Sequence, residues 1–251
     1  MGGALSRRLG GVGSPPGPPF DPATLFSGTQ GGFWDISDGA TLFTDQSAEG
    51  TFPTPVTADN DPIGQINDKS GNNNHVKYNT PNSGKRPLYK ANSGLPYALF
   101  DGTDDWLRAT FTFGTTWERI SAIQVVAFNG AINEQYYGDV IANECVFGSG
   151  SNLTMFNGVA TGGVQAATAG VDIVLSEQWG SSMQLRIDNG SFNSVGNAAV
   201  DPGGITMASK FDGGDSANMR IYACFMINRA LTSTERANVV TFMGSKQGRS
   251  L

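Results

Sequence analysis

The sequence predicts an all-β antiparallel sandwich that forms one domain, and three features of the composition indicate this class. Among 251 residues there are 34 Gly and 12 Pro, the two residues that interrupt regular structure. Apolar residues make up 39% and aromatic residues 10%, so a core is available and a disordered chain is excluded. Charged residues make up only 15%, which argues against a helical bundle. Sandwiches of roughly this length often form a single domain.

Short apolar segments separated by turn residues predict the strands. The segment richest in β-branched residues, 120–128, is expected to be a central strand. A polar segment with several prolines, residues 44–62, separates two of the predicted strands. The other predicted strands are residues 31–37, 40–43, 95–102, 105–113, 139–147, 152–158, 171–179, 183–192 and 219–227.

Two of these strands have informative patterns. Residues 183–188 alternate apolar and polar side chains, which predicts a half-buried strand, and Asn189-Gly190 is expected to form a type I′ hairpin turn with positive φ. In residues 219–227 both alternating sets are apolar, which predicts a strand covered on both faces. The expected faces are Ile221, Ala223, Phe225 and Ile227 on one side and Tyr222, Cys224 and Met226 on the other.

One segment predicts a helix. Thr232 and Glu235 have the spacing of a capping box, in which each side chain bonds the other residue's backbone amide. Leu231 precedes the box, and the helix is expected to end near Gly244. Its apolar stripe consists of Val239, Val240, Phe242 and Met243.

Residues 1–20 differ from the remainder, 21–251, and are expected to form an extended arm. They are rich in Gly and Pro, show no hydrophobic periodicity and favour polyproline II. Such an arm is ordered only when a partner holds it, so we expect it to anchor the domain to another protein. The residues expected to make this contact are Arg7, Arg8, Pro15, Pro16, Pro18, Pro19 and Phe20.

Charge and cysteine content exclude several functions. The net charge is −6 and the pI about 4.7, which argues against nucleic acid as a partner. No apolar run is long enough to cross a membrane. The N-terminus lacks the apolar segment of a secretory signal, so no such signal is expected. Cys145 and Cys224 are expected to be buried reduced thiols or, alternatively, one disulfide. With His75 the single histidine, no zinc site and no cofactor are expected.

Four stretches, in order along the chain, resemble the motifs of one family. They are W-D-I-S-D to T-L-F-T-D (34–45, with 55–58 and 61–64), D-x-S-G-N-x-N-H (68–75, with Arg86-Pro87), F-D-G-x-D-D-x-L (100–107) and N-R-A-L-T-x-x-E-R (228–236). Asn73 stands where the family pattern has glycine. Through them, residues 31–243 resemble the concanavalin A-like (LamG-like) jelly-roll proteins found among bacteriophage structural proteins. The resemblance implies a jelly-roll sandwich with one short C-terminal helix and the N-terminal arm.

This resemblance also implies a function. It points to a non-enzymatic virion protein, a capsid decoration, head fibre or tail-associated module that is made in the host cytoplasm. The arm would attach it to capsid, portal, adaptor or tail proteins, as a homo-oligomer or in many copies. A carbohydrate-binding module that recognises host surface glycans is the alternative, because such folds host several functions.

Two polar clusters are candidate sites. Asp68, Asn72, Asn74 and His75 form a possible ligand loop, although the same residue types also stabilise turns. No catalytic role is expected for His75. A second cluster, Asp101, Asp104 and Asp105, offers oxygen ligands for Ca²⁺ but lacks EF-hand spacing, so a hairpin turn without metal is expected.

Catalytic carboxylates are not expected. Glycoside hydrolysis requires two carboxylates on either side of the sugar bond, and no E-x-D-x-E triplet occurs. Asp139 and Glu144 are too far apart to form one, and Glu177 stands alone. The chain is therefore expected not to be an enzyme. Three tryptophans are expected in the core, with stacking on sugars as the alternative: Trp106, Trp117 and Trp179.

Overall fold

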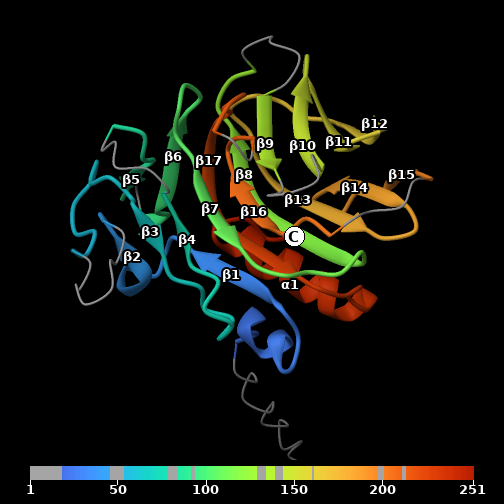
Figure 1. Ribbon diagram of the computed structural model, residues 1–251, viewed down its shortest axis with the longest axis horizontal. Coiled ribbons are helices and arrows are strands. Elements are labelled where there is room, and N and C mark those ends of the chain that lie inside the picture. Colours follow the sequence, from blue (N-terminus) through green and yellow to red (C-terminus); the bar gives the residue numbers. More distant parts are fainter. Residues whose placement is uncertain are drawn as a thin grey trace, which may run out of the picture.

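The chain folds into two antiparallel β-sheets packed face to face, with one α-helix against the outer face of one sheet (Figure 1). This computed structural model describes residues 19–45, 54–78, 84–91, 94–128, 134–138, 144–159, 161–196, 201–210 and 213–251. Within these residues the predicted jelly-roll-like sandwich with a short C-terminal helix is confirmed. Of the predicted arm, only Pro19 and Phe20 belong to the described residues.

Sheet A has eight strands in the described chain, in the order β15-β14-β13-β8-β17-β6-β5, and β1 pairs with β17 beside this order. Its strands are β1 (Gly31–Asp35), β5 (Leu88–Lys90), β6 (Tyr97–Asp101), β8 (Trp117–Val125), β13 (Asp172–Trp179), β14 (Met183–Ile187), β15 (Asn193–Val195) and β17 (Asn218–Ile227). The longest strands, β8 and β17, lie next to each other at its centre.

Sheet B has nine strands in the described chain, in the order β12-β11-β10-β9-β16-β7-β4-β3-β2. Its strands are β2 (Leu42–Phe43), β3 (Gln65–Ile66), β4 (Val76–Lys77), β7 (Leu107–Thr110), β9 (Glu134–Gly138), β10 (Glu144–Ser149), β11 (Asn152–Asn157), β12 (Thr161–Ala166) and β16 (Gly204–Met207). The 3-10 helices η1 (Pro22–Phe26) and η2 (Gly39–Thr41) flank β1.

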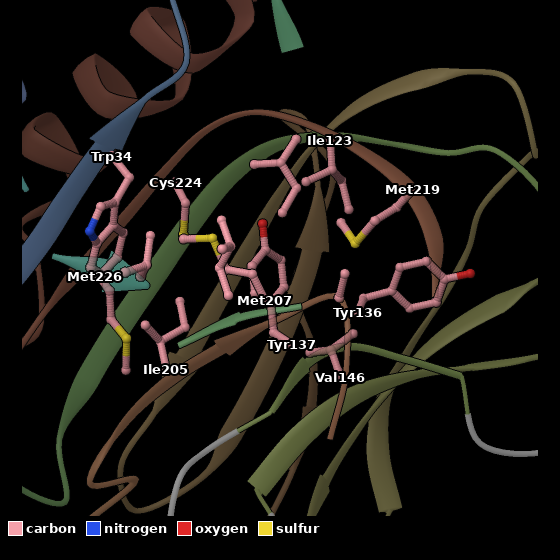
Figure 2. Packing of buried hydrophobic residues seen from close by; sticks show 14 of the residues in the cluster. Trp34, Ile123, Tyr136, Tyr137, Val146, Ile205, Met207, Met219, Cys224 and Met226 are labelled. Atoms are coloured by element: carbon pink, nitrogen blue, oxygen red, sulfur yellow. The ribbon is translucent and has the colours of Figure 1, made fainter. Parts of the chain in front are cut away.

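The main core lies between the two sheets. Figure 2 shows Cys224 and Met226 of β17 in the same layer as Met207 of β16 and Tyr137 of β9. These side chains are almost completely buried, as are the large tryptophan rings of the same core: Trp34, Trp117 and Trp179. Alternate residues of each strand point into this layer, so one face of each sheet is apolar.

A second core lies on the outer face of sheet A, under α1 (Ser233–Ser245) and η1. Val239, Val240 and Met243 of α1 are fully buried there, as predicted. The predicted capping box is confirmed, because the Thr232 hydroxyl accepts from the Glu235 amide and the Glu235 carboxylate accepts from the Thr232 amide. Among the described residues, no helix combines the length and apolarity needed to span a bilayer.

The central strand begins earlier than predicted. The segment 120–128 was expected, but β8 starts at Trp117 and includes Glu118 and Arg119. Charged residues are untypical of a central strand, yet both are buried because each pairs with an opposite charge. The predicted strand 139–147 begins at Glu144 in the structure, and residues 139–143 lie outside the described chain.

Two local predictions are wrong. The chain turns at Asp188, which has φ of 52°, and neither residue of Asn189-Gly190 has positive φ, so no type I′ turn forms. Asp188 is held instead by hydrogen bonds with Val174 on the neighbouring strand. In β17 a bulge between Ile221 and Ala223 shifts the alternation. Ala223 therefore faces α1 rather than sharing the inner face with Ile221, although the strand is covered on both sides as predicted.

Candidate functional site

The predicted ligand loop, residues 68–75, lies beside β1 and bonds to it. The Asp68 carboxylate accepts from the Phe33 amide at 2.9 Å and from the amides of Ser70 and Asn74 at 2.8 and 3.0 Å. The Ser70 hydroxyl donates to the same carboxylate at 2.7 Å. Four donors thus occupy Asp68, which leaves it poorly placed to bind a ligand.

The other residues of this loop are also engaged. The Asn72 and Asn74 side-chain amides both donate to the Gly31 carbonyl, at 3.2 and 2.6 Å. Nδ1 of His75 accepts from the Asp68 amide at 3.0 Å, and burial together with nearby Lys77 lowers the histidine pKa. The structure therefore favours the turn interpretation of this loop over the ligand interpretation.

Gly31 lets β1 pack closely against β17. Its φ is 149°, and a Cβ at this position would come within 2.1 Å of the Met226 carbonyl oxygen. Only glycine fits between β17 and the Phe26 ring at this point. Gly31 thus serves the close pairing of β1 with β17.

Of the residues expected to anchor the arm, only Pro19 and Phe20 can be placed. The Phe20 ring packs edge-on against Phe242 of α1, with 6.5 Å between centroids. Phe20 is thus held, at least in part, by its own domain. The remaining predicted contacts lie outside the described residues: Arg7, Arg8, Pro15, Pro16 and Pro18.

Asp101, Asp104 and Asp105 come together at the loop between β6 and β7. One carboxylate oxygen from each lies within 4.8 Å of the others. Asp105 is 4% exposed, and its Oδ2 accepts from the Asp101 amide at 3.0 Å. Burial and the negative charges of the other two aspartates raise the pKa of Asp105 to about 7. Lys85 lies 3.7 Å from Asp104. This loop therefore combines a protonatable carboxyl with two further acidic side chains.

Glu177 and the tryptophans lie in the core. Glu177 is fully buried, and its oxygens accept from Arg119 Nε at 2.9 Å and Nη2 at 2.5 Å. The Trp179 indole also donates to this carboxylate, at 3.2 Å, and stacks on Trp117 with 4.9 Å between centroids. Trp106 is 7% exposed. These rings are core residues, as predicted, and do not offer a face for sugar stacking.

Both cysteines are buried and no disulfide joins them, so the reduced alternative is confirmed. Burial raises the pKa of the Cys224 thiol to about 11, although the nearby Arg119 opposes the shift. A protonated, buried thiol is unreactive. Neither Cys145 nor Cys224 is thus a candidate nucleophile.

A polar face that the sequence did not single out lies on the outer side of β14 and β15. Gln184 and Arg186 of β14 point away from the core, and Ser194 of β15 is exposed beside them. Phe192, half-buried, adds an aromatic ring, and Arg236 of α1 lies next to it. We call these five side chains the β14–β15 face. Hydrogen-bonding side chains around an aromatic ring are typical of surfaces that bind polar ligands.

No family model matches the sequence, and no curated protein is similar to it. Solved structures nevertheless share the fold. A GH54 α-L-arabinofuranosidase soaked with a cyclic sulfate inhibitor aligns over 90% of this chain with a TM-score of 0.64 and 13% identity. This chain spans only 65% of that enzyme's length.

Two binding proteins also align. Domain 4 of AbnA, a GH43 extracellular arabinanase from Geobacillus stearothermophilus solved with arabinotriose, aligns over 84% of this chain and 98% of its own, with a TM-score of 0.55 and 10% identity. The binding domain of Paraclostridial Mosquitocidal Protein 1 aligns over 84% of this chain and 53% of its own, with a TM-score of 0.56 and 12% identity. At these identities the similarity shows a shared lectin-like β-sandwich.

The expectation that this chain is not an enzyme is wrong in light of these structures. It was based on the missing E-x-D-x-E triplet, but a glycoside hydrolase has the same fold over 90% of this chain. Absence of one motif on one strand therefore does not exclude hydrolysis, because catalytic carboxylates can come from other elements of the same fold.

Proposed function

We propose that this protein is a carbohydrate-binding domain. The observation that supports this most is the alignment with nearly the whole of AbnA domain 4, a domain solved with a bound arabinotriose. Because that alignment covers 98% of domain 4, the similarity concerns a complete binding unit rather than part of a larger catalytic fold. The β14–β15 face supplies hydroxyl, amide and guanidinium groups beside an aromatic ring, which suit sugar hydroxyls and apolar ring faces.

Calorimetric titration of the full chain tests this proposal. Arabinotriose and a panel of bacterial surface polysaccharides are the probes, and saturable binding of at least one is expected. The same protein unfolded in urea serves as the control. A folded sample, verified by circular dichroism, that binds no glycan of the panel would overturn the proposal.

Glycoside hydrolysis is a second candidate, favoured by the acidic loop. Asp105 with a pKa of about 7 can hold a proton at neutral pH, while Asp101 and Asp104 offer carboxylates within 4.8 Å. Retaining glycosidases place an acid and a nucleophile about 5–5.5 Å apart. Asp105 would protonate the leaving oxygen while a neighbouring carboxylate attacks the anomeric carbon and the glycosidic bond breaks. Water, deprotonated by Asp105, would then release the sugar from that carboxylate.

Release of nitrophenol from 4-nitrophenyl glycosides tests this second function. We expect turnover that is lost in Asp105→Asn, since the amide cannot donate a proton as an acid. Asp61→Asn, a carboxylate in another loop, is the matched control. No turnover by the folded protein, or turnover unchanged in Asp105→Asn, would exclude this site.

We also propose that the domain is displayed on a bacteriophage particle, attached to other virion proteins by residues 1–20. Support comes from the sequence motifs and the composition of the arm. Deletion of residues 1–18 keeps Phe20 on α1 and should abolish incorporation into particles while leaving the melting temperature unchanged. Normal incorporation of this variant would contradict the role of the arm.

A further inference from the structure

Arg186 on the β14–β15 face has no acidic partner among the described residues. Its guanidinium lies over the Phe192 ring but forms no hydrogen bond or ion pair with the described residues, and its Nε is buried without a partner. Other arginines of the described chain pair with carboxylates: Arg86 with Asp45, Arg119 with Glu177, Arg229 with Glu235, Arg236 with Glu118 and Arg249 with Asp188.

A second buried polar group without a hydrogen-bond partner lies directly opposite Arg186, on the neighbouring strand. Ser176 of β13 is opposite Arg186 in the strand register and shares its face. It is 1% exposed, and its Oγ is also buried without a hydrogen-bond partner in the described structure. Buried polar atoms normally find partners, so two adjacent exceptions show that the described structure leaves polar groups unsatisfied beneath this face.

The nearest charged neighbours of Arg186 are Arg236 and Glu118, which pair with each other. Arg236 lies on the same Phe192 ring, 5.8 Å from its centroid, while the Arg186 guanidinium is at 4.6 Å. The nearby carboxylate of Glu118 is already engaged, because it accepts twice from Arg236 and once from the Leu231 amide. Burial and the positive charge of Arg236 accordingly lower the pKa of Arg186.

Polar groups suited to a sugar surround this cation. Gln178 can donate to Gln184 Oε1 at 2.7 Å and accept from Arg236 Nε at 2.8 Å in the orientation that satisfies both ends of its amide. This arrangement fixes Gln184 beside Arg186. Ser194, exposed on the next strand, offers a hydroxyl. In Figure 1, β14 and β15 form one margin of the molecule, away from β1 and η1.

We propose that the β14–β15 face binds carboxylate-bearing sugars, with Arg186 as the residue that recognises the carboxylate. This inference rests on the proposed carbohydrate-binding function and names its site and ligand class. A guanidinium pairs with a carboxylate through two parallel hydrogen bonds, which a neutral sugar cannot provide. Gln184 and Ser194 bind hydroxyls, and the Phe192 edge contacts the sugar ring.

Calorimetry with three trisaccharides tests the proposal: trigalacturonic acid, its fully methyl-esterified form and neutral arabinotriose. We expect the acid to bind about tenfold more tightly than the ester, since a hydrogen bond to a charged group is lost on esterification. Arg186→Gln should abolish this preference, and Arg186→Lys should retain part of it. Arg220→Gln is the matched control, because Arg220 on β17 of the same sheet also has a buried, unpartnered Nε.

The outcomes separate this inference from the proposed function. Binding of neutral trisaccharides without preference for the acid, or a preference unchanged in a folded Arg186→Gln, would overturn the inference and leave carbohydrate binding intact. Loss of the preference in Arg220→Gln but not in Arg186→Gln would also overturn it. Failure of the folded protein to bind any glycan would reject both. Melting curves establish that each variant is folded.

Discussion

At the scale of single residues, Arg119 and Glu177 form a fully buried ion pair in the core. Both side chains are at most 2% exposed, and the guanidinium also lies over the rings of Tyr137 and Trp117. Glu177 raises the pKa of Arg119 despite the opposing effect of burial, so the pair stays charged. Buried ion pairs contribute little net stability but are costly to break.

Glu177→Gln should therefore destabilise the protein. Arg119 would remain charged in the core without a counterion, and we expect a loss of about 3–5 kcal/mol in the free energy of unfolding. Urea denaturation followed by tryptophan fluorescence measures it. The double variant Arg119→Met/Glu177→Leu should recover most of the loss. A double variant as unstable as the single one would contradict this explanation.

Asp105 predicts a pH dependence of stability. Its pKa is about 7 in the folded protein, whereas an aspartate in an unfolded chain has a pKa of about 3.9. Protonation of Asp105 therefore stabilises the folded protein, and this effect is complete below pH ~4. As pH rises from ~4 to ~7 the effect is lost, and the free energy of unfolding falls by up to about 1.4 kcal/mol per pH unit. Asp105→Asn should thus gain stability relative to wild type as pH rises from about 4 to about 7, and the difference should be constant above that. A difference in melting temperature that stays constant from pH ~4 to ~7 would contradict this.

At the scale of elements, the loop of residues 68–75, which joins β3 and β4 of sheet B, bonds to β1 of sheet A. Asp68 accepts from backbone amides on both segments, including that of Phe33 in β1. The same loop also bonds the Gly31 carbonyl through Asn72 and Asn74. Residues that look like a ligand site in the sequence therefore act as a connection between distant segments.

Asp68→Ala should cost about 2–4 kcal/mol, because several partly buried amides lose their acceptor together. Asp61→Ala is the control, since Asp61 accepts from the Thr57 and Ala58 amides within one exposed loop and should cost less. Urea unfolding measures both variants. Equal losses in the two variants would show that Asp68 does not hold β1.

At the scale of the whole molecule, the reactivity of the two buried thiols measures global unfolding. Cys145 is 3% exposed and Cys224 is fully buried with a pKa of about 11. Labelling with Ellman's reagent at pH 8 should therefore be slow and should accelerate with urea in parallel with the unfolded fraction. Reducing agent should leave the melting temperature unchanged. Rapid labelling of the native protein would contradict this picture, and Cys145→Ser assigns the signal.

The sequence predicted features that depend on neighbouring residues. The capping box at Thr232 and Glu235, and the half-buried alternation in β14, were both recovered. Short strands such as β3, β4 and β16 were missed, because two to four residues carry too little periodicity. The turn at Asn189-Gly190 failed because a tertiary contact to Asp188 prevailed over a local preference.

The sequence by itself determined the β-sandwich class, the single C-terminal helix and the burial of both cysteines, since these follow from composition and local periodicity. Only the tertiary structure decided which charged residues meet. Arg119 and Glu177 are 58 positions apart, and Arg186 lies 50 positions before the Arg236 that shares its ring. Strand order places such residues together, and strand order depends on long-range packing that no local pattern encodes.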